Sequence, residues 1–342
     1  MKRKINIALI GAGGIGHLWA KAISEMKGVI LCAVADINEK SALSISQDFP
    51  RCKALKDWHK ILDDNDIDAV LVTTPHKWLA PITLSALKAG KHVLCEKPSG
   101  VNAAEVAKNI IMAKKKKLVY MPGFNHRYHP AYMKAREIFE EGGIGEVNFI
   151  RARYGFGGRP GYGKEWRLNK KIAGGGELLD QGIHMIDMVR WFLGDFEKVH
   201  GFAENFFWGG DVEDNGFVLM RTKKGQVASI HVSWTNWEWV HSFEIFGDNG
   251  YLLIDGLDER YQGPEQLVWG KRDKMFTKPQ EKAYVFKSEQ KHDSMRREME
   301  DFVSAIHGNL SKRKILPKGE DAYESLRIVE KVYKDNYGNF KK

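Results

Sequence analysis

The chain has 342 residues, of which 43% are hydrophobic and 28% charged, values typical of a globular protein large enough for two domains. Its 53 lysines and arginines outnumber its 44 aspartates and glutamates, and the net charge of +9 favours anionic partners without choosing among them. No run of about 18 apolar residues and no Cys/His cluster with zinc spacing occurs, so we expect neither a membrane span nor a metal site.

The first 122 residues alternate strand-like and helix-like segments, which predicts a doubly wound parallel sheet. The expected strands are Ile5–Ile10, Val29–Ala35, Asp68–Thr73, His92–Cys95 and Leu118–Met121. The expected helices are Ile15–Lys27, Asn38–Asp48 with Asn38 as its N-cap, Leu79–Ala89 and Ala103–Lys116. Cys32 and Cys95 fall inside the apolar strands, as expected of core cysteines in a reducing compartment, so we expect a cytoplasmic protein.

A glycine motif, Gly11-Ala12-Gly13-Gly14-Ile15-Gly16, joins the first strand to the first helix and fits G-x-G-x-x-G. Such a turn lets the backbone approach a pyrophosphate at the helix N-terminus, so Gly14 and Ile15 are counted with the glycines as cofactor-binding residues. Asp36 ends the second strand about 20 residues later, where an acid accepts hydrogen bonds from ribose hydroxyls and repels a 2′-phosphate. No arginine follows Asp36, and we therefore predict NAD rather than NADP as the cofactor.

Two polar stretches directly follow later strands of this sheet. Thr74-Pro75-His76 follows one strand and Glu96-Lys97-Pro98 follows another. Ligands of open parallel sheets bind beyond the carboxyl ends of the strands, so both stretches are expected to face the cofactor. Lys97 can donate to a substrate hydroxyl and stabilise the oxyanion that forms, or it can pair with Glu96, and these residues alone leave both roles open.

The pattern changes after Pro122, and we predict a second domain over residues 123–342 for substrate binding and oligomerisation. A helix at Tyr128–Glu141, a glycine-rich loop at Gly155–Gly176 and a helix at Leu178–Phe192 are expected first. Alternating strands between Glu197 and Ile254 then predict a largely antiparallel sheet with one buried face, and helices near Ser294–Ile306 and Glu320–Lys334 follow. The aromatic segment Ser233–Trp239 is expected to be one of the strands.

Asp180 and His184 lie four residues apart on the helix expected at Leu178–Phe192, so they would share one face. A histidine can take the proton of a carbinol while its hydride leaves to a nicotinamide, and Asp180 can hold a neighbouring hydroxyl. Asp187 can orient the histidine ring. A pair of this kind can also do no more than stabilise a helix, and the pair by itself leaves both readings open.

The segment Arg151–Lys171 carries seven basic residues against one acidic residue, Glu165, with aromatic residues interleaved. Guanidinium groups bind phosphates and aromatic rings offer stacking faces, so the segment suits an anionic substrate such as a nucleotide-diphosphate sugar; a solvated basic loop is the alternative. The substrate-binding candidates are Asn125, Arg127, Tyr154, Arg159, Trp166 and Arg167. No nucleic-acid motif accompanies the positive charge, so no nucleic-acid partner is expected.

The motifs in this order resemble those of the Gfo/Idh/MocA family of glucose–fructose oxidoreductase, inositol dehydrogenase and rhizopine-catabolism proteins. The resemblance rests on the glycine motif with Asp36, GKHVLCEKP, IGEV at residues 144–147, GGGELLDQGIHMID and the closing PKGEDAYESLRIVEKVY. It implies an N-terminal Rossmann domain over residues 1–122 and a C-terminal α/β domain whose open sheet forms homodimers or homotetramers. It also implies that Lys97, Asp180 and His184 are catalytic, and that the cofactor contacts include Gly11, Gly13, Gly16, Asp36, Thr74, Pro75 and Glu96.

The loop after Thr74 departs from the family pattern, which often reads TP-N-x-x-H. Here His76 replaces the asparagine and Leu79 replaces the histidine, which leaves the cofactor contact of this loop open. The expected activity is hydride transfer between NAD and a secondary hydroxyl of a sugar, with a nucleotide-diphosphate sugar as the leading substrate. The alternatives are an inositol or free-sugar dehydrogenase, a glycosidase that retains its NAD, and a dinucleotide-binding protein without enzymatic activity.

Overall fold

The computed structural model describes residues 3–258, 261–273, 275, 278–287, 292–309 and 315–336. The chain divides into two compact units, Met1–Asn125 with His292–Tyr323, and His126–Lys291 with Glu324–Lys342. The domain boundary expected after residue 122 stays a prediction. Within the described residues no helix is both long enough and apolar enough to cross a bilayer.

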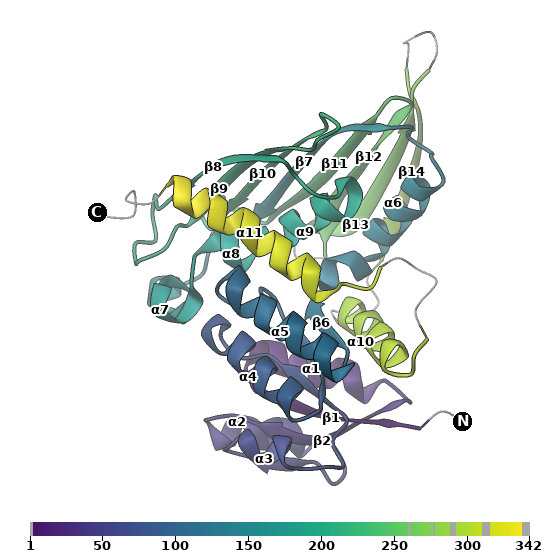
Figure 1. Cartoon of the computed structure of the whole chain (residues 1–342). Coiled ribbons are helices and arrows are strands. Elements are labelled where there is room, and N and C mark those ends of the chain that lie inside the picture. Colours follow the sequence, from purple (N-terminus) through teal and green to yellow (C-terminus); the bar gives the residue numbers. More distant parts are fainter. Residues whose placement is uncertain are drawn as a thin grey trace. The chain divides into compact units, whose positions relative to one another are not determined.

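The first unit is built on a six-stranded sheet, of which Figure 1 labels β1, β2 and β6. The strand order is β3-β2-β1-β4-β5-β6, and every neighbouring pair is parallel. The strands are β1 Ile5–Ile10, β2 Val29–Ala35, β3 Lys53–Leu55, β4 Ala69–Val72, β5 His92–Glu96 and β6 Tyr120–Gly123. The helices are α1 Gly14–Ser24, α2 Glu39–Ser46, α3 His59–Leu62, α4 His76–Lys88, α5 Ala103–Lys116 and α10 Asp293–Ile306. This strand order reverses between β1 and β4, the position at which doubly wound sheets bind dinucleotides.

Local signals explain most of these elements. The apolar runs of β1 and β4 are almost completely buried, as expected for strands covered on both faces. Asn38 accepts a hydrogen bond from the Lys40 amide and so caps α2, as predicted. The sequence missed β3 and α3, which have three and four residues and are too short to show a period. Helix α4 begins three residues earlier than expected, directly after Pro75.

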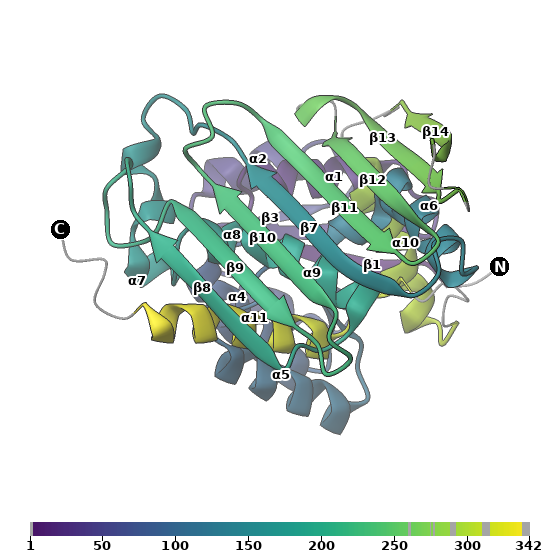
Figure 2. The same ribbon diagram turned by 90° about the horizontal axis from the view of Figure 1, so that it is seen from above.

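The second unit is built on an eight-stranded sheet in the order β14-β13-β12-β11-β7-β10-β9-β8 (Figure 2). Only β7 and β10 pair in parallel, so the sheet is mostly antiparallel. The strands are β7 Val147–Gly155, β8 Lys198–Glu204, β9 Asn215–Arg221, β10 Val227–Ser233, β11 Val240–Gly247, β12 Gly250–Leu257, β13 Tyr261–Lys271 and β14 Gln280–Phe286. The predicted fold class, a parallel Rossmann sheet followed by a large antiparallel sheet, is confirmed.

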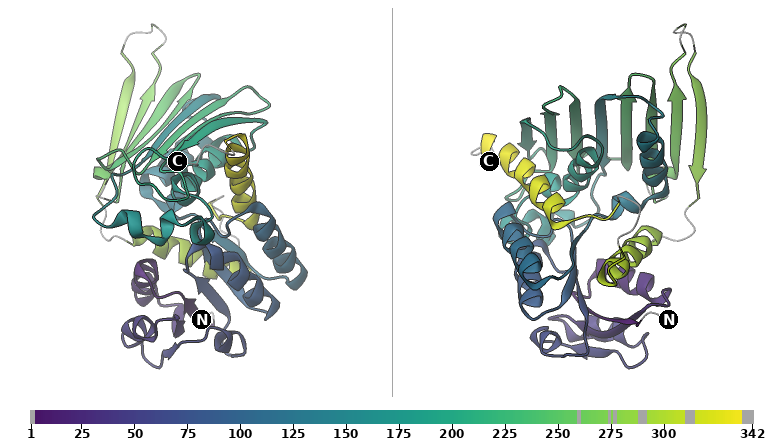
Figure 3. Two further views of the ribbon diagram at one scale, coloured as in Figure 1. Left: turned by 90° about the vertical axis from the view of Figure 1, so that its left-hand side faces the viewer. Right: turned by 45° about the vertical axis from the view of Figure 1, so that its right-hand side comes forward.

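Helices cover one face of this sheet (Figure 3). They are α6 Pro130–Glu140, α8 Glu177–Asp180 and α9 Gly182–Leu193, joined by the short α7 Lys170–Ala173 and by the 3₁₀ turns η1 Asn125–Tyr128, η2 Tyr162–Lys164 and η3 Trp166–Leu168. Helix α11, Gly319–Asp335, runs from the first unit into the second. Along β7, β8 and β9 buried residues alternate with exposed ones, and the exposed set includes Phe149, Phe202, Phe217 and Leu219. The other face of the sheet is therefore partly apolar.

Two predicted elements of the second unit are wrong. The single helix expected at Leu178–Phe192 is divided at Gln181 into α8 and α9. Gly182 follows the break, and a Cβ there would lie 3.0 Å from side-chain atoms of both Leu178 and Val232, so a larger residue would require these side chains to move. The strand expected at Ser233–Trp239 is a loop after Ser233 in which Trp237 has a φ of 58°.

Candidate active site

The glycine motif forms a tight turn between β1 and α1 in the first unit. Gly11 has a φ of 107°, and a Cβ there would lie 2.7 Å from the carbonyl carbon of Thr73, at the end of β4. A Cβ on Gly16 would lie 2.3 Å from the Gly11 carbonyl oxygen, so this glycine lets α1 pack on its own entry turn. Both glycines are therefore required by close approach, and Gly11 also by its positive φ.

The same turn has the features that a dinucleotide requires. A Cβ on Gly13 or Gly14 would meet nothing within 4 Å, so space lies over the turn, and no side chain caps α1 at Gly13. The first amides of a helix have no partner within it, so those of α1 suit the pyrophosphate. Thr74 Oγ1 is buried without a hydrogen-bond partner among the described residues, another group suited to a cofactor contact.

Asp36 lies at the end of β2, partly exposed, beside the glycine turn. Its Oδ2 accepts from the Ala12 amide at 2.7 Å and its Oδ1 from the Asn38 amide at 2.8 Å. These bonds hold the carboxylate in place, and its remaining lone pairs are suited to the hydroxyls of a ribose. Ile37, the next residue, is exposed and apolar, so it supplies no positive charge for a 2′-phosphate.

Lys97 directly follows β5 and is partly exposed. Its amide donates to Glu96 Oε2 at 3.2 Å, while Glu96 Oε1 accepts from the Trp19 indole N–H at 2.7 Å. The Lys97–Pro98 peptide bond is cis. In the same unit, His76 is buried at the first position of α4, and Leu79 is completely buried in that helix. Leu79, in place of the usual histidine, is therefore a core residue.

Asp180 ends α8, and His184 lies in the first turn of α9; both are buried. They occupy two helices rather than one face of a single helix. Asp180 Oδ2 accepts from Arg167 Nε at 2.9 Å. The imidazole of His184 packs against that of His126, with ring centroids 3.9 Å apart. Arg167, predicted to bind substrate, thus contacts a candidate catalytic residue.

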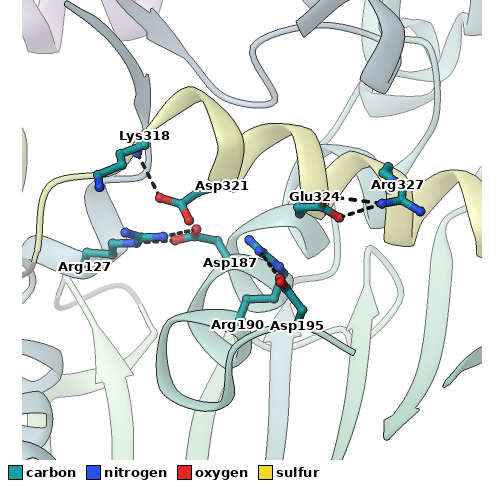
Figure 4. A network of polar contacts seen from close by, with 8 residues as sticks. All are labelled: Arg127, Asp187, Arg190, Asp195, Lys318, Asp321, Glu324 and Arg327. Atoms are coloured by element: carbon teal, nitrogen blue, oxygen red, sulfur yellow. Dashed lines mark hydrogen bonds and ion pairs between the residues drawn. The ribbon is translucent and has the colours of Figure 1, made fainter. Parts of the chain in front are cut away.

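Asp187, predicted to orient His184, forms a bidentate ion pair with Arg127 (Figure 4). Arg127 Nε lies 2.8 Å from Asp187 Oδ2, and Arg127 Nη2 lies 2.5 Å from Asp187 Oδ1. The two side chains are only 4% and 1% exposed, and the guanidinium also lies over the Trp191 ring. This pair joins η1 to α9. A direct substrate contact by Arg127, and one by Asn125, whose amide donates to Ser294 Oγ at 3.2 Å, stay predictions.

Several arginines of the basic segment are already paired with carboxylates. Arg159 binds Glu165 through two hydrogen bonds of 2.7 and 2.8 Å, and Arg167 Nη1 lies 3.3 Å from the same carboxylate. Arg151 Nε donates to Glu244 Oε2 at 2.9 Å. Burial opposes the charge of Arg167, but Asp180, Tyr162 and Glu165 outweigh burial and raise its pKa. The local positive charge is therefore smaller than the sequence suggests.

Aromatic packing anchors this segment within the second unit. Phe156, Tyr162 and Leu168 form a buried cluster with Val212 and Trp234. A Cβ on Gly157 would lie 2.8 Å from Trp237 Cα, and one on Gly158 would lie 2.2 Å from the Trp208 ring. These glycines allow close approach of the two tryptophans to the backbone. Trp166, a substrate candidate, is half-buried with the Arg167 guanidinium 4.7 Å from its ring centroid.

Sequence reasoning missed a cluster of buried histidines around His184. His126 lies 5.3 Å from the Tyr154 ring and 6.1 Å from that of His241, measured between ring centroids. Burial, and then the neighbouring His129, lower the pKa of His241 to about 3, so that ring is neutral at neutral pH. The signal available was the segment Asn125-His126-Arg127-Tyr128-His129, whose two histidines lie three residues apart, a spacing that puts both on one side of a helical turn. Tyr154, a predicted substrate residue, is buried in this cluster.

A Rossmann sheet with a glycine turn, an acid at the end of β2 and space over the helix N-terminus is typical of a dinucleotide-binding protein. Two family models match the chain. Residues 5–124 match the oxidoreductase family with an NAD-binding Rossmann fold, and residues 132–253 match the GFO/IDH/MocA C-terminal domain. The chain belongs to the GFO/IDH/MocA oxidoreductase family.

Known proteins similar to the chain include sugar and cyclitol dehydrogenases. The levoglucosan dehydrogenase of Pseudarthrobacter phenanthrenivorans is 31% identical over 292 residues, 74% of each chain. The myo-inositol 2-dehydrogenase of Thermotoga maritima is 31% identical over 263 residues, 75% of this chain and 76% of the relative. A solved levoglucosan dehydrogenase in complex with NADH superposes with a TM-score of 0.87 at 25% identity, covering 98% of each chain.

The predicted family and the predicted NAD cofactor are confirmed. The chain is an NAD-dependent oxidoreductase of the family that contains these dehydrogenases, which removes the alternative of a binding protein without enzymatic activity.

Replacing Asp36 with asparagine is expected to narrow the preference for NAD over NADP, because the substitution removes the negative charge facing a 2′-phosphate. The amide oxygen still accepts one of the two hydrogen bonds that hold the turn. Fluorescence titration of both cofactors measures the ratio of the two dissociation constants. Glu39→Gln, an exposed acid in the first turn of α2, is the matched control and should leave the ratio unchanged. An unchanged ratio in Asp36→Asn would show that Asp36 does not determine the preference for NAD over NADP.

Proposed function

We propose that the chain transfers a hydride between NAD and a secondary hydroxyl or keto group of an uncharged sugar or cyclitol. The observation that carries the choice of an uncharged substrate is the pairing of Arg151, Arg159 and Arg167 with carboxylates of the chain itself. A phosphate would have to compete with Glu165 and Asp180 for these guanidinium groups. The two relatives described above are named for an anhydrosugar and a cyclitol, both uncharged.

Lys97, Asp180 and His184 are the residues to which we assign the chemistry. NAD, when bound, supplies the acceptor for the hydride. His184 takes the proton of the reacting hydroxyl as general base, and Lys97 donates a hydrogen bond to that oxygen as its negative charge develops. Asp180 accepts a hydrogen bond from a neighbouring hydroxyl of the substrate. Arg167 holds Asp180 in place, because it donates to the carboxylate.

A nucleotide-diphosphate sugar, the substrate expected from the sequence, is the second candidate. Lys164, Lys170 and Lys171 are exposed, and no ion pair engages them among the described residues. They remain available for a diphosphate at the edge of the basic segment.

A substrate panel separates the two candidates. Levoglucosan, myo-inositol and free hexoses should be oxidised with a higher kcat/KM than UDP-, GDP-, CDP- or dTDP-sugars, and salt should hardly change their KM. Exposed charges are screened beyond about 8 Å at physiological ionic strength, so a diphosphate substrate would lose affinity as salt rises. Lys170→Glu is expected to leave the KM of the uncharged substrate unchanged. A nucleotide sugar that is the best substrate, and whose KM rises with salt and in Lys170→Glu, would reverse the choice.

The same panel tests the reaction class. Net NADH formed in equal amount to oxidised sugar indicates a dehydrogenase. Release of an aglycone from a glycoside without net NADH would indicate the glycosidase that retains its cofactor.

The assembly expected from the family resemblance, a homodimer or homotetramer, also stays a proposal. Exposed apolar side chains on one face of the eight-stranded sheet support it; they are Phe149, Phe202, Phe217 and Leu219. Sedimentation analysis gives the number of subunits, and a monomer at micromolar concentration would contradict the assembly.

We keep the cytoplasm as the expected compartment, since Cys32, Cys52 and Cys95 are free thiols.

A further inference from the structure

The turn that carries Asp180 is held by one buried residue, Glu213. Glu213 Oε2 accepts from the Gly176 amide at 3.0 Å, and its Oε1 accepts from the Leu178 amide at 3.1 Å. The main-chain oxygen of Glu213 accepts from the Glu177 amide at 3.1 Å. Three successive amides at the start of α8 are therefore bound by a single residue, which lies 35 to 37 positions further along the chain.

Tyr333, near the end of α11, holds this carboxyl group from another direction. Its hydroxyl donates to Glu213 Oε1 at 2.6 Å. Burial, and then the adjacent Glu213, keep the pKa of Tyr333 well above its usual value, so the hydroxyl remains a donor over the whole working pH range. The carboxyl group of Glu213 thus receives three hydrogen bonds, one from a side chain and two from the backbone.

This arrangement explains two of the three glycines before α8. A Cβ on Gly176 would lie 1.8 Å from the main-chain oxygen of Glu213, and one on Gly175 would lie 2.1 Å from the Tyr333 hydroxyl oxygen. Neither glycine has a positive φ, so close approach, not backbone conformation, requires them. Any larger residue would push the turn away from Glu213 and Tyr333.

We propose that Glu213 and Tyr333 are positioning residues that fix the α8 turn, and with it the carboxylate of Asp180 and the start of the helix that bears His184. The proposal rests on the proposed function, because it assumes that Asp180 and His184 carry out the chemistry. Its physical basis is that a displacement of about 1 Å in a reacting group can lower turnover by about 100-fold. The short α8 has one turn only, so its position depends on what its first amides bind.

The hydrogen bonds that Glu213 accepts depend on whether its carboxyl group is protonated. Burial raises the pKa of Glu213 to about 7, although Tyr333 and the amides of Gly176 and Leu178 favour the ionised form. The ionised carboxylate accepts from all three donors, whereas the protonated group must use one oxygen as a donor and accepts less well. The hydrogen bonding of the turn should therefore change as pH passes through about 7.

Other charged groups nearby face elsewhere. Asp214, the next residue, accepts from the amides of Phe206, Phe207 and Trp208. The carboxyl group of Glu177 acts on Tyr162, where burial and then Asp180 and Glu177 raise the tyrosine pKa. Because the pKa of Glu213 is higher in the fold than its usual value of 4.5, its contribution to global stability is full at low pH and is lost as pH rises through about 7.

Three variants test the proposal: Glu213→Gln, Tyr333→Phe and the control Asp211→Asn, whose carboxylate is exposed in the same segment. In Glu213→Gln the side-chain NH₂ group is itself a donor, so it cannot accept the hydrogen bonds that the carboxylate accepted. Amide hydrogen exchange in the peptide spanning residues 174–181 should therefore rise at least 10-fold. Turnover should fall by about 10- to 100-fold, with little change in the KM for sugar. Asp211→Asn should change neither quantity.

Tyr333→Phe keeps the carboxyl group and removes one donor to its ionised form. The transition near pH 7 in the exchange of residues 174–181 should therefore move to higher pH, and the acid limb of the kcat profile should move with it. Proton transfer at His184 can also make kcat depend on pH, so the shift caused by Tyr333→Phe, rather than the presence of a transition, is the decisive result. This variant also serves if Glu213→Gln does not fold.

The outcomes separate the two proposals. Unchanged amide hydrogen exchange in both Glu213→Gln and Tyr333→Phe would show that these residues do not hold the α8 turn. Faster exchange with unchanged kcat would show that the turn is held by Glu213 and Tyr333 but does not position the catalytic residues. If His184→Asn loses activity in that case, the proposed function still stands. Full activity in His184→Asn would instead contradict the proposed function, and the exchange measurements would still decide whether Glu213 and Tyr333 hold the turn.

Discussion

His184→Asn is expected to lower kcat by about 100- to 10,000-fold while leaving the dissociation constant of NAD nearly unchanged. Asparagine has no group that takes a proton near neutral pH, so the hydroxyl of the substrate would have to lose its proton to water. NAD affinity should persist because the glycine turn and Asp36 lie in the other unit of the chain. Initial rates of NADH formation and a fluorescence titration of NAD measure the two quantities.

His200→Asn is the matched control for this substitution, since His200 is exposed on β8, and it should keep normal turnover. The melting temperature of His184→Asn must also be compared with that of the unmodified protein, because His184 packs against His126. Lys97→Met should cause a loss of similar size, as it removes the donor to the reacting oxygen. Near-normal turnover in either variant would remove that residue from the mechanism.

Asp187→Asn is expected to lower the free energy of unfolding of the second unit by about 3–5 kcal/mol, because it removes the negative charge that forms a bidentate pair with the buried guanidinium of Arg127. Both side chains are almost completely buried, so water cannot replace the lost carboxylate. Urea unfolding followed by circular dichroism and tryptophan fluorescence measures the change.

Asp195→Asn makes the same chemical change in an exposed ion pair and serves as the control (Figure 4). Asp195 is 79% exposed, so its pair with Arg190 should contribute no more than about 1 kcal/mol. The double variant Arg127→Met with Asp187→Leu should regain much of the stability lost in Asp187→Asn, because it removes the uncompensated charge. Equal losses of unfolding free energy in Asp187→Asn and Asp195→Asn would show that the buried ion pair contributes no more to stability than the exposed one.

The sequence by itself determined the features that depend on neighbouring residues. The glycine motif between an apolar strand and a helix, Asp36 after the next strand, and Asn38 as a helix cap are local patterns, and their geometry follows from backbone sterics and hydrogen bonding. Alternation of strands and helices was sufficient for the parallel sheet, and alternation of buried and exposed residues for the antiparallel one. Together with the motif resemblance, these patterns predicted the family and the cofactor.

The tertiary structure alone decided which charged groups meet. Arg127 and Asp187 are 60 residues apart, Arg151 and Glu244 are 93 apart, and Glu213 and Tyr333 are 120 apart. Sequence periodicity indicates only which nearby residues share a face, so it cannot reveal such pairs. They meet only when the intervening helices and strands have folded. The sequence therefore overstated the free positive charge of Arg151–Lys171 and did not reveal the pairing of Asp187 with Arg127. It also missed the break at Gln181, where packing of Gly182 on β10 overrides a continuous helical pattern.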